Sequence, residues 1–261
     1  MVNHLGIAWQ ATPIGAIDPE DFYDFQSVRP KIEMVGGQTR RIVWPDVEIY
    51  EARIPRAPRD LILLAGTEPS YRWRTFSRLI VELAEAIGVQ LVVTLGALLA
   101  DVPHTRPVSV TALASDPALV SRLDLSQSSY EGPTGIVGVL HGACQEAGLP
   151  SASLWAAVPH YIAAAPNPKA ALALVRKLEG LVGVAVDATE LENATSDYER
   201  QVNLAVQSDP EVQAFVERLE QAAGGEQEDE PSIPSGDSIA RDLQRFLRQR
   251  GGDDVAGGGA R

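Results

Sequence analysis

The sequence predicts an α/β protein in three layers, with a mostly parallel sheet covered by helices on both faces. Continuous apolar runs at residues 61–66 and 89–96 are typical of strands buried on both faces. Beyond residue 60 such runs alternate with segments of helical spacing, which favours parallel strands joined by helices. A chain of 261 residues, 45% hydrophobic and 22% charged, has enough apolar material for this core.

The first sixty residues have a different pattern. Residues 2–11 are expected to form a helix that ends before Pro13. Short apolar stretches between residues 22 and 53, interrupted by Gly36-Gly37, predict two or three β segments with a hairpin near the glycines. Residues 46–54 alternate with a period of two and form the clearest strand of this region.

Strands and helices alternate from residue 60 to residue 181. Strands are expected at residues 61–66, 89–96, 108–115 and 151–160. Helices are expected at residues 73–88, 116–123, 135–150 and 167–181. Gly88 and Gly148 suit helix ends, because glycine accepts a left-handed conformation. Asn167 followed by Pro168 is a favourable helix start.

The last third of the chain is expected to extend the core. The predicted parts are an α/β core at 1–188, an acidic helical extension at 189–222, a linker at 223–236, an amphipathic helix at 237–250 and a disordered tail at 251–261. The extension is expected to hold two helices, the second starting at Asp209-Pro210. The amphipathic helix is expected to pack one apolar stripe on the core or a neighbouring subunit, formed by Ile239, Leu243, Phe246 and Leu247.

The charge of the protein is concentrated in one segment. The formal net charge is −13, and residues 179–230 hold 14 acidic and 2 basic residues. No basic footprint for nucleic acid is present, so neither DNA nor RNA is an expected partner. The acidic segment has two interpretations: a solvated face that aids solubility, or a surface that docks onto a basic partner.

Several classes of protein and site are disfavoured by the sequence. Cys144 is the single cysteine, which excludes an intramolecular disulfide and a multi-cysteine zinc site; its apolar neighbours predict a buried small side chain. No apolar run reaches the roughly 18–20 residues of a membrane span, and no basic stretch opens the chain as in a secretory signal. We expect a cytoplasmic protein with no membrane partner. No metal or cofactor is expected, since H-x-x-x-H and H-E-x-x-H motifs are lacking. The lack of a G-x-S-x-G motif disfavours a serine nucleophile.

Four polar loops are expected beyond the carboxyl ends of strands, where open α/β sheets bind ligands. They span residues 66–74, 96–107, 130–135 and 158–170. We expect them to share one pocket with candidate residues Glu68, Arg72, Asp101, His104, Thr105, Arg106, Glu131, Thr134 and His160. Arg72 lies at a helix entry, which favours anions, and Thr134 is expected to cap the next helix.

Each loop also has a structural interpretation. In the order of the loops along the chain, these are a turn with a surface ion pair, a crossover held by hydrogen bonds, a capped turn, and a hydrogen-bonded histidine. Acidic and histidine side chains that converge in a cleft would indicate an enzyme. A splayed, solvated arrangement would indicate an assembly role.

Three runs resemble a known family. They are LVVTLGALLADVPHTRPVSVTALASDP, YEGPTGIVGVLHGAC and SLWAAVPHYIAAAPNPKA. They are similar to the prokaryotic, actinobacterial-type branch of the proteasome-assembly-chaperone-2 (PAC2) family, over residues 20–250. The resemblance implies an α/β/α fold similar to purine nucleoside phosphorylases, and a homo-oligomer, for which we expect a trimer.

Two departures from the family pattern give further expectations. Family members usually begin with a strand and a loop resembling E-G-W-N-D-A-G, so we expect that the first βα unit is missing here and that an exposed sheet edge or groove results. Archaeal relatives that engage the proteasome end in a hydrophobic residue, Tyr and one more residue. This chain ends in Gly-Gly-Ala-Arg, which does not support that docking mode.

The resemblance and the loops together give two function hypotheses. The leading one is a non-enzymatic, chaperone-like or protein-assembly factor with a protein partner. The alternative is a small-molecule-binding protein or enzyme with a nucleoside-like or anionic ligand at the carboxyl edge of the strands. An ATP-dependent ligase is disfavoured, because no Gly-rich nucleotide loop or metal-binding acidic pair is present.

Overall fold

The computed structural model of the chain describes residues 1–37, 39–54, 57, 59–116, 126–128, 130–162 and 166–225. The helix expected at 116–123, the amphipathic helix at 237–250 with its apolar stripe, and the tail at 251–261 lie outside these residues, apart from Asp116. No helix in the described ranges is long and apolar enough to cross a membrane.

The amino-terminal half is an antiparallel sheet. After the expected first helix, α1 (Val2–Ala8), come β1 (Thr12–Ile17), β4 (Val47–Ala52) and β5 (Leu61–Gly66), in the order β1-β4-β5. The sequence did not predict β1, because Pro13 and Gly15 are poor strand formers. The strand register shifts between these two residues.

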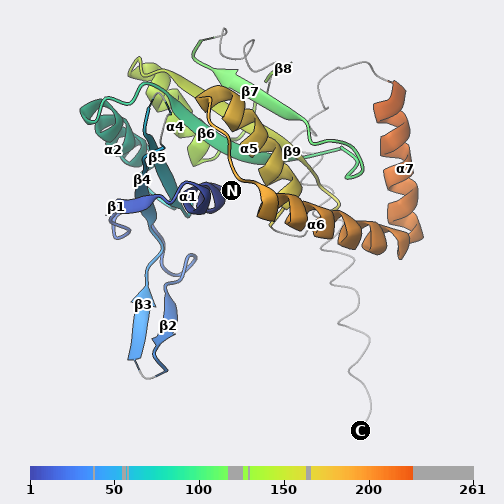
Figure 1. Cartoon of the computed structure of the whole chain (residues 1–261), viewed down its shortest axis with the longest axis horizontal. Coiled ribbons are helices and arrows are strands. Elements are labelled where there is room, and N and C mark those ends of the chain that lie inside the picture. Colours follow the sequence, from blue (N-terminus) through green and yellow to red (C-terminus); the bar gives the residue numbers. More distant parts are fainter. Residues whose placement is uncertain are drawn as a thin grey trace.

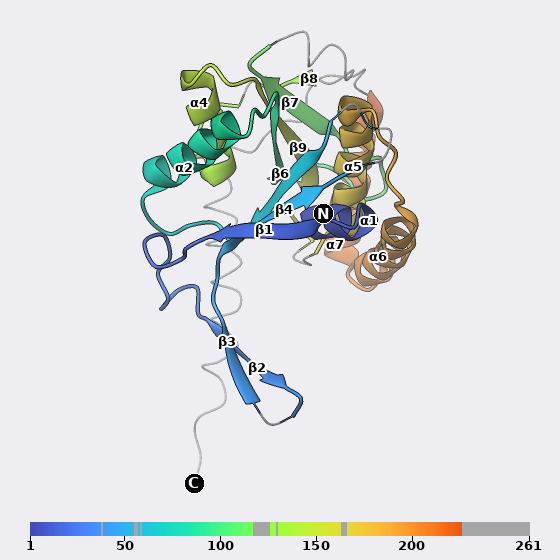
Figure 2. The ribbon, with the colours of Figure 1, turned by 60° about the vertical axis from the view of Figure 1, so that its left-hand side comes forward.

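A hairpin projects from this half (Figures 1 and 2). Its strands are β2 (Lys31–Val35) and β3 (Thr39–Val43), which pair antiparallel with Ile32 opposite Ile42. Gly36 and Gly37 have φ angles of +62° and +75°, a tight-turn geometry that suits glycine at both positions. The hairpin expected at these glycines is confirmed.

The second sheet has the order β6-β9-β7-β8, with strands β6 (Val92–Ala100), β9 (Ser151–Pro159), β7 (Val110–Ala114) and β8 (Ser126–Gln127). β6 is parallel to β9, and β7 is parallel to β8 but antiparallel to β9. Antiparallel pairs therefore predominate over both sheets, and the prediction of a mostly parallel sheet is wrong. The reason is connection length: the links from β4 to β5 and from β6 to β7 are too short for a parallel crossover.

Helices cover both faces of the sheets (Figure 1). On one face lie α2 (Trp73–Ala86) and α4 (Ile136–Glu146), which pack on each other; α5 (Pro168–Val182) lies on the other. The two helices expected in the extension are α6 (Thr189–Gln207) and α7 (Pro210–Gly225), and α6 packs on α5. Leu154 of β9 and Cys144 of α4 are fully buried, as expected for the cysteine.

β5 and β6 lie between the same two helix layers without pairing to each other. Leu63 and Val93 pack against one cluster of α1 and α5 residues. Leu140 of α4 packs with Leu64 in one cluster and with Val92 in another. In the described ranges β5 hydrogen-bonds only to β4, and β6 only to β9. Each strand thus presents a free edge, and the expected burial of 61–66 on both faces is wrong, since these residues are half-exposed or exposed.

Candidate functional site

The four polar loops meet in two pairs. The ends of β6 and β9 are in register, Ala100 beside Pro159, so the loops that follow these strands begin together. The loop after β5 reaches the start of α4, where the Glu68 carboxylate accepts a 2.7 Å hydrogen bond from the Ile136 N–H. No contact between the two pairs is found among the nine candidate residues within the described ranges.

The loop after β5 and the loop before α4 together form a capped turn. Glu68 satisfies one of the free N–H groups at the start of α4, as a helix N-terminus requires. Gly135, not Thr134, is the N-cap residue, so the expected Thr134 cap is wrong. A Cβ on Gly135 would lie 2.8 Å from Glu68 Oε1, so the glycine allows the carboxylate to approach. The side chain of Glu131 is exposed.

Arg72 lies at the entry of α2, as the sequence predicts, but it has a protein partner. Its backbone is left-handed, with a φ of +57°, and its guanidinium lies 2.8 Å from an Asp21 carboxylate oxygen. Both side chains are more than half exposed, so the ion pair adds little stability. The surface ion pair among the structural alternatives is therefore present here.

Asp101 and His160 form the closest acid–base pair of the site. Asp101 Oδ1 lies 2.8 Å from His160 Nδ1. This nitrogen makes no aligned hydrogen bond with any residue that the structure describes, and the contact is an ion pair only when the ring is protonated. The His160 ring packs edge-on against Phe215 of α7, 5.5 Å between centroids, and against Tyr161 at 6.0 Å. These contacts bring the loop after β9 against the helical extension.

His104 is buried and fully bonded. Its Nδ1 and its backbone N–H both contact the Tyr161 hydroxyl at 2.8 Å, and its Nε2 lies 3.0 Å from the Asn203 amide oxygen. The Tyr161 hydroxyl accepts the backbone N–H and can donate to Nδ1, which places the ring proton on Nε2, facing Asn203. Burial raises the pKa of Tyr161 to about 12, so the hydroxyl stays protonated.

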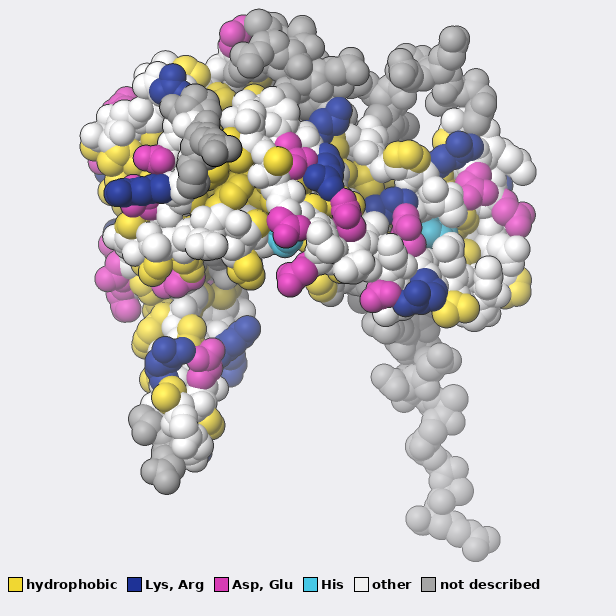
Figure 3. All heavy atoms as spheres, in the orientation of Figure 1, with side chains coloured by type: hydrophobic (Ala, Val, Ile, Leu, Met, Phe, Trp, Pro, Cys, Tyr) yellow, Lys and Arg dark blue, Asp and Glu magenta, His cyan; other side chains and the backbone are white. Residues whose placement is uncertain are grey.

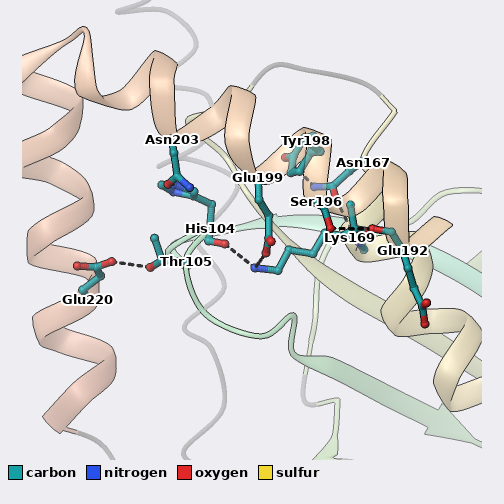
Figure 4. Close-up of polar contacts among 12 residues, drawn as sticks. His104, Thr105, Asn167, Lys169, Glu192, Ser196, Tyr198, Glu199, Asn203 and Glu220 are labelled. Carbon is teal, nitrogen blue, oxygen red and sulfur yellow. Dashed lines mark hydrogen bonds and ion pairs between the residues drawn. The ribbon is translucent and has the colours of Figure 1, made fainter. Parts of the chain in front are cut away.

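Two further contacts tie the loop after β6 to helices (Figure 4). Lys169 of α5 donates to the His104 carbonyl at 2.6 Å and pairs with Glu199 of α6 at 2.7 Å. The Thr105 hydroxyl donates to the Glu220 carboxylate of α7. Arg106 is exposed and makes no ion pair with a described residue.

Sequence reasoning missed the helical half of this network. Lys169, Asn203 and Glu220 lie far along the chain from the loop they bind, and no motif links them to it. The one available signal is Lys169, one of only 3 lysines, which precedes the apolar run 170–175 in the first half of the helix.

The chemistry available at this edge is limited. Asp101 and His160 are a carboxylate and an imidazole in contact, as in a general acid–base pair. No nucleophile contacts His160, and no three metal-ligating side chains converge, in the part of the chain that the structure describes. A shallow hollow lies at the opposite edge of the sheet, lined in part by Gln90, Gln145 and Pro150, and includes none of the nine candidates. The loop residues mainly hold loops and helices together.

Comparison with known proteins identifies the family. The family model described as PAC2 family matches residues 1–206, most of the chain. The chain belongs to the PAC2 family. Among curated proteins, none matches it.

Solved structures of PAC2 proteins share the fold. A PAC2 family protein from Streptomyces avermitilis is 47% identical, with a TM-score of 0.76 over 82% of this chain and 91% of that chain. A proteasome-assembly chaperone homologue from Mycobacterium tuberculosis is 44% identical, with a TM-score of 0.74 and the same coverage. An archaeal proteasome activator from Pyrococcus furiosus is 20% identical with a TM-score of 0.63, over 78% of this chain and 86% of that chain, a likeness of fold alone.

Proposed function

We propose that this PAC2 protein is a chaperone-like assembly factor whose carboxyl-edge loops bind a protein partner. The observation that carries the proposal is a difference between the polar and the apolar residues of these loops. Polar candidates such as His104, Thr105 and Glu68 bond to the protein itself. Large apolar side chains of the same loops and strand ends face solvent instead. A surface of this kind favours protein binding over chemistry on a small molecule.

The exposed apolar residues lie on three of the four loop or strand ends. Tyr71 precedes α2, Leu99 is near the end of β6, and Tyr130 precedes α4. Their exposed fractions are 54%, 48% and 47%. Tyrosine is enriched among residues that contribute most to protein interfaces. These three side chains are therefore the proposed contact points.

The proposed partners are the proteasome subunits of the same organism. This part of the proposal rests on the family and on the 44% identical proteasome-assembly chaperone homologue. The partner surface would offer pockets for the tyrosine rings; the Tyr130 hydroxyl already donates to the Pro133 carbonyl at 2.9 Å, which holds its ring in place.

The test combines binding and assembly. Separately purified proteasome α and β subunits are mixed with the full chain; binding is measured by interferometry and core-particle formation by native gel. The variant is Tyr71→Ala with Tyr130→Ala. The control is Ile87→Ala, equally exposed at 49% but at the far end of α2. We expect the double variant to bind at least about tenfold more weakly, since truncating an interface aromatic costs more than about 1 kcal/mol.

Two results would overturn the proposal: no binding of the full chain to either subunit, or equal binding by the double variant. The contact between Asp101 and His160 favours one alternative, a nucleoside-like or anionic ligand. Thermal shifts with nucleosides, nucleotides and phosphate test it in the parent and in Asp101→Asn. A ligand that stabilises the parent alone would establish the alternative.

A further inference from the structure

Helix α7 is held to the rest of the protein along one of its sides. Val216 is buried in a hydrophobic cluster with Val202 of α6. Glu220 accepts the hydrogen bond from Thr105 that joins α7 to the loop after β6. In Figure 1 α7 stands apart from the sheets, with α6 beside its amino-terminal end. The remaining sides of α7 are therefore open to a further contact.

One of these sides is apolar. Phe215, Leu219 and Ala222 are four and three residues apart, which places them on the same side of the helix. Phe215 and Leu219 are half-exposed, and Ala222 is exposed. Phe215 contacts the ring of His160, whereas Leu219 belongs to none of the hydrophobic clusters found among the described residues. A side with this spacing is suited to pack against a second helix.

The same chain contains a segment with matching spacing. The amphipathic helix expected at residues 237–250 lies outside the described residues. Its apolar stripe includes Ile239, Leu243 and Phe246, which are again four and three residues apart. An antiparallel arrangement pairs the two sets in a single register: Ile239 with Ala222, Leu243 with Leu219, and Phe246 with Phe215.

The length of the connecting chain suits an antiparallel pair. The connection is formed by the eleven residues 226–236, which span at most about 40 Å. Neighbouring helix axes are only about 8–10 Å apart. α7 has 16 residues and is about 24 Å long, and a helix over residues 237–250 would be about 21 Å long. The segment can therefore turn back and lie along α7.

The charged residues beside the two apolar stripes agree with the same register. Glu211 and Arg218 of α7 are exposed, and neither makes an ion pair with a residue that the structure describes. Figure 3 shows acidic, basic and hydrophobic side chains close together at the end of the molecule where α7 lies. The antiparallel register places Arg250 at the level of Glu211, and Asp242 at the level of Arg218. Opposite charges at both levels favour this register over a shifted one.

We propose that residues 237–250 form a helix that packs antiparallel on α7 of the same chain, against Phe215, Leu219 and Ala222. The short connection holds the segment near α7 at an effective concentration of about millimolar, which favours it over any separate molecule. Because α7 is bonded to the loop after β6, the docked helix also stabilises the position of that loop. The contact goes beyond the proposed assembly function, which depends on other residues.

A pair of introduced cysteines tests the contact in the full chain. The variant is Leu219→Cys with Leu243→Cys, and the native Cys144 does not compete because it is fully buried. We expect a disulfide to form within one chain, at a rate that is unchanged when the protein is diluted about tenfold. The control is Leu79→Cys with Leu243→Cys, since Leu79 is exposed on α2, in the other helix layer. Intact mass after alkylation separates disulfides within a chain from those between chains.

Hydrogen exchange gives a second measurement without cysteines. We expect the amides of residues 238–249 to exchange at least about tenfold more slowly in the full chain than in a synthetic peptide of residues 226–261. Leu219→Asp with Ala222→Asp should abolish this protection, whereas the control Leu79→Asp should keep it. Unchanged exchange of β9 shows that each variant is folded.

Three results would overturn the proposal. The first is a Leu219→Cys with Leu243→Cys variant that forms no disulfide, or forms it only between chains. The second is equal exchange of residues 238–249 in the full chain and the peptide. The third is protection that survives Leu219→Asp with Ala222→Asp, because the segment would then be docked elsewhere. The proteasome-binding assay of the proposed function is independent of all three.

Discussion

The two halves of the body are built by different means. In the half made of β6, β9, β7 and the helices after them, strand β9 is paired on both sides, and buried polar groups such as Thr94 and Ser153 bond to each other at 2.8 Å. In the half made of β1, β4 and β5, the strands are mostly exposed or half-exposed, and β5 has one free edge. Helices cover both halves, so the difference between them lies in strand pairing: β9 has no free edge, whereas β5 does.

Hydrogen exchange should show the largest difference between the halves. The amides of β9 bond to both neighbours, so they should open only with global unfolding. Alternate amides of β5 face its free edge and should exchange with an opening free energy at least about 3 kcal/mol lower. Mass spectrometry of peptides from the two strands measures this difference. Equal protection of β5 and β9 would mean that the halves are one cooperative unit.

A matched pair of truncations is expected to give the next largest effect. Leu154→Ala removes a fully buried side chain of β9 and should cost about 2–5 kcal/mol of unfolding free energy. Ile32→Ala on the β2–β3 hairpin removes an exposed side chain and should change that free energy by less than about 0.5 kcal/mol. Urea denaturation at low protein concentration measures both. A large loss of unfolding free energy from Ile32→Ala would contradict the view that the hairpin adds little to the stability of the rest of the protein.

The Tyr161 hydroxyl is expected to matter less than a core leucine but more than an exposed hydroxyl. Tyr161→Phe leaves the buried His104 Nδ1 and backbone N–H without their partner, at a cost of about 1–3 kcal/mol. Tyr50→Phe, which removes a solvent-accessible bond to Glu48, is the control and should cost less than about 0.5 kcal/mol. The same denaturation assay compares them. Equal small losses would show that the loop network does not hold the carboxyl half together.

Replacing His141 is expected to have the smallest effect on the unfolding free energy, and this effect depends on pH. Burial lowers the pKa of His141 from its usual 6.5, and neither ring nitrogen has a hydrogen-bond partner among the described residues. As the pH falls below 6.5, His141 becomes protonated in the unfolded chain but stays neutral in the folded protein. The unfolding free energy therefore decreases. His141→Leu should flatten the profile between pH 7.5 and about pH 5. His4→Gln is the control and should keep the decrease; an unchanged slope in His141→Leu would contradict the assignment.

Local sequence signals predicted most elements but not how they pair. Asn167 caps α5 through a 2.9 Å bond from the Ala170 N–H, as its place before Pro168 predicts. The apolar run 61–66 is a strand, as expected, but its periodicity says nothing of its direction or its partners. The direction of a strand depends on the length and path of the connection that leads to it. The links from β4 to β5 and from β6 to β7 are too short for a parallel crossover.

The candidate site was predictable only in part, for a similar reason. Asp101 and His160 follow neighbouring strand ends, so strand order brings them together. The bond between His104 and Asn203 spans 99 residues, and it depends on how α6 folds back over the loops. No local pattern encodes that return path. Loop composition alone therefore cannot separate a structural tie from a catalytic group.

The free edges of β5 and β6 divide the strands of the protein into two separate sheets. Helices lie above and below both strands, and each edge offers a row of backbone donors and acceptors. A synthetic peptide rich in valine and isoleucine would find hydrogen bonds on two sides and apolar contacts on both faces. Its arrival would join the two halves into one continuous sheet, so that the melting temperature of the whole protein would report on a few added residues.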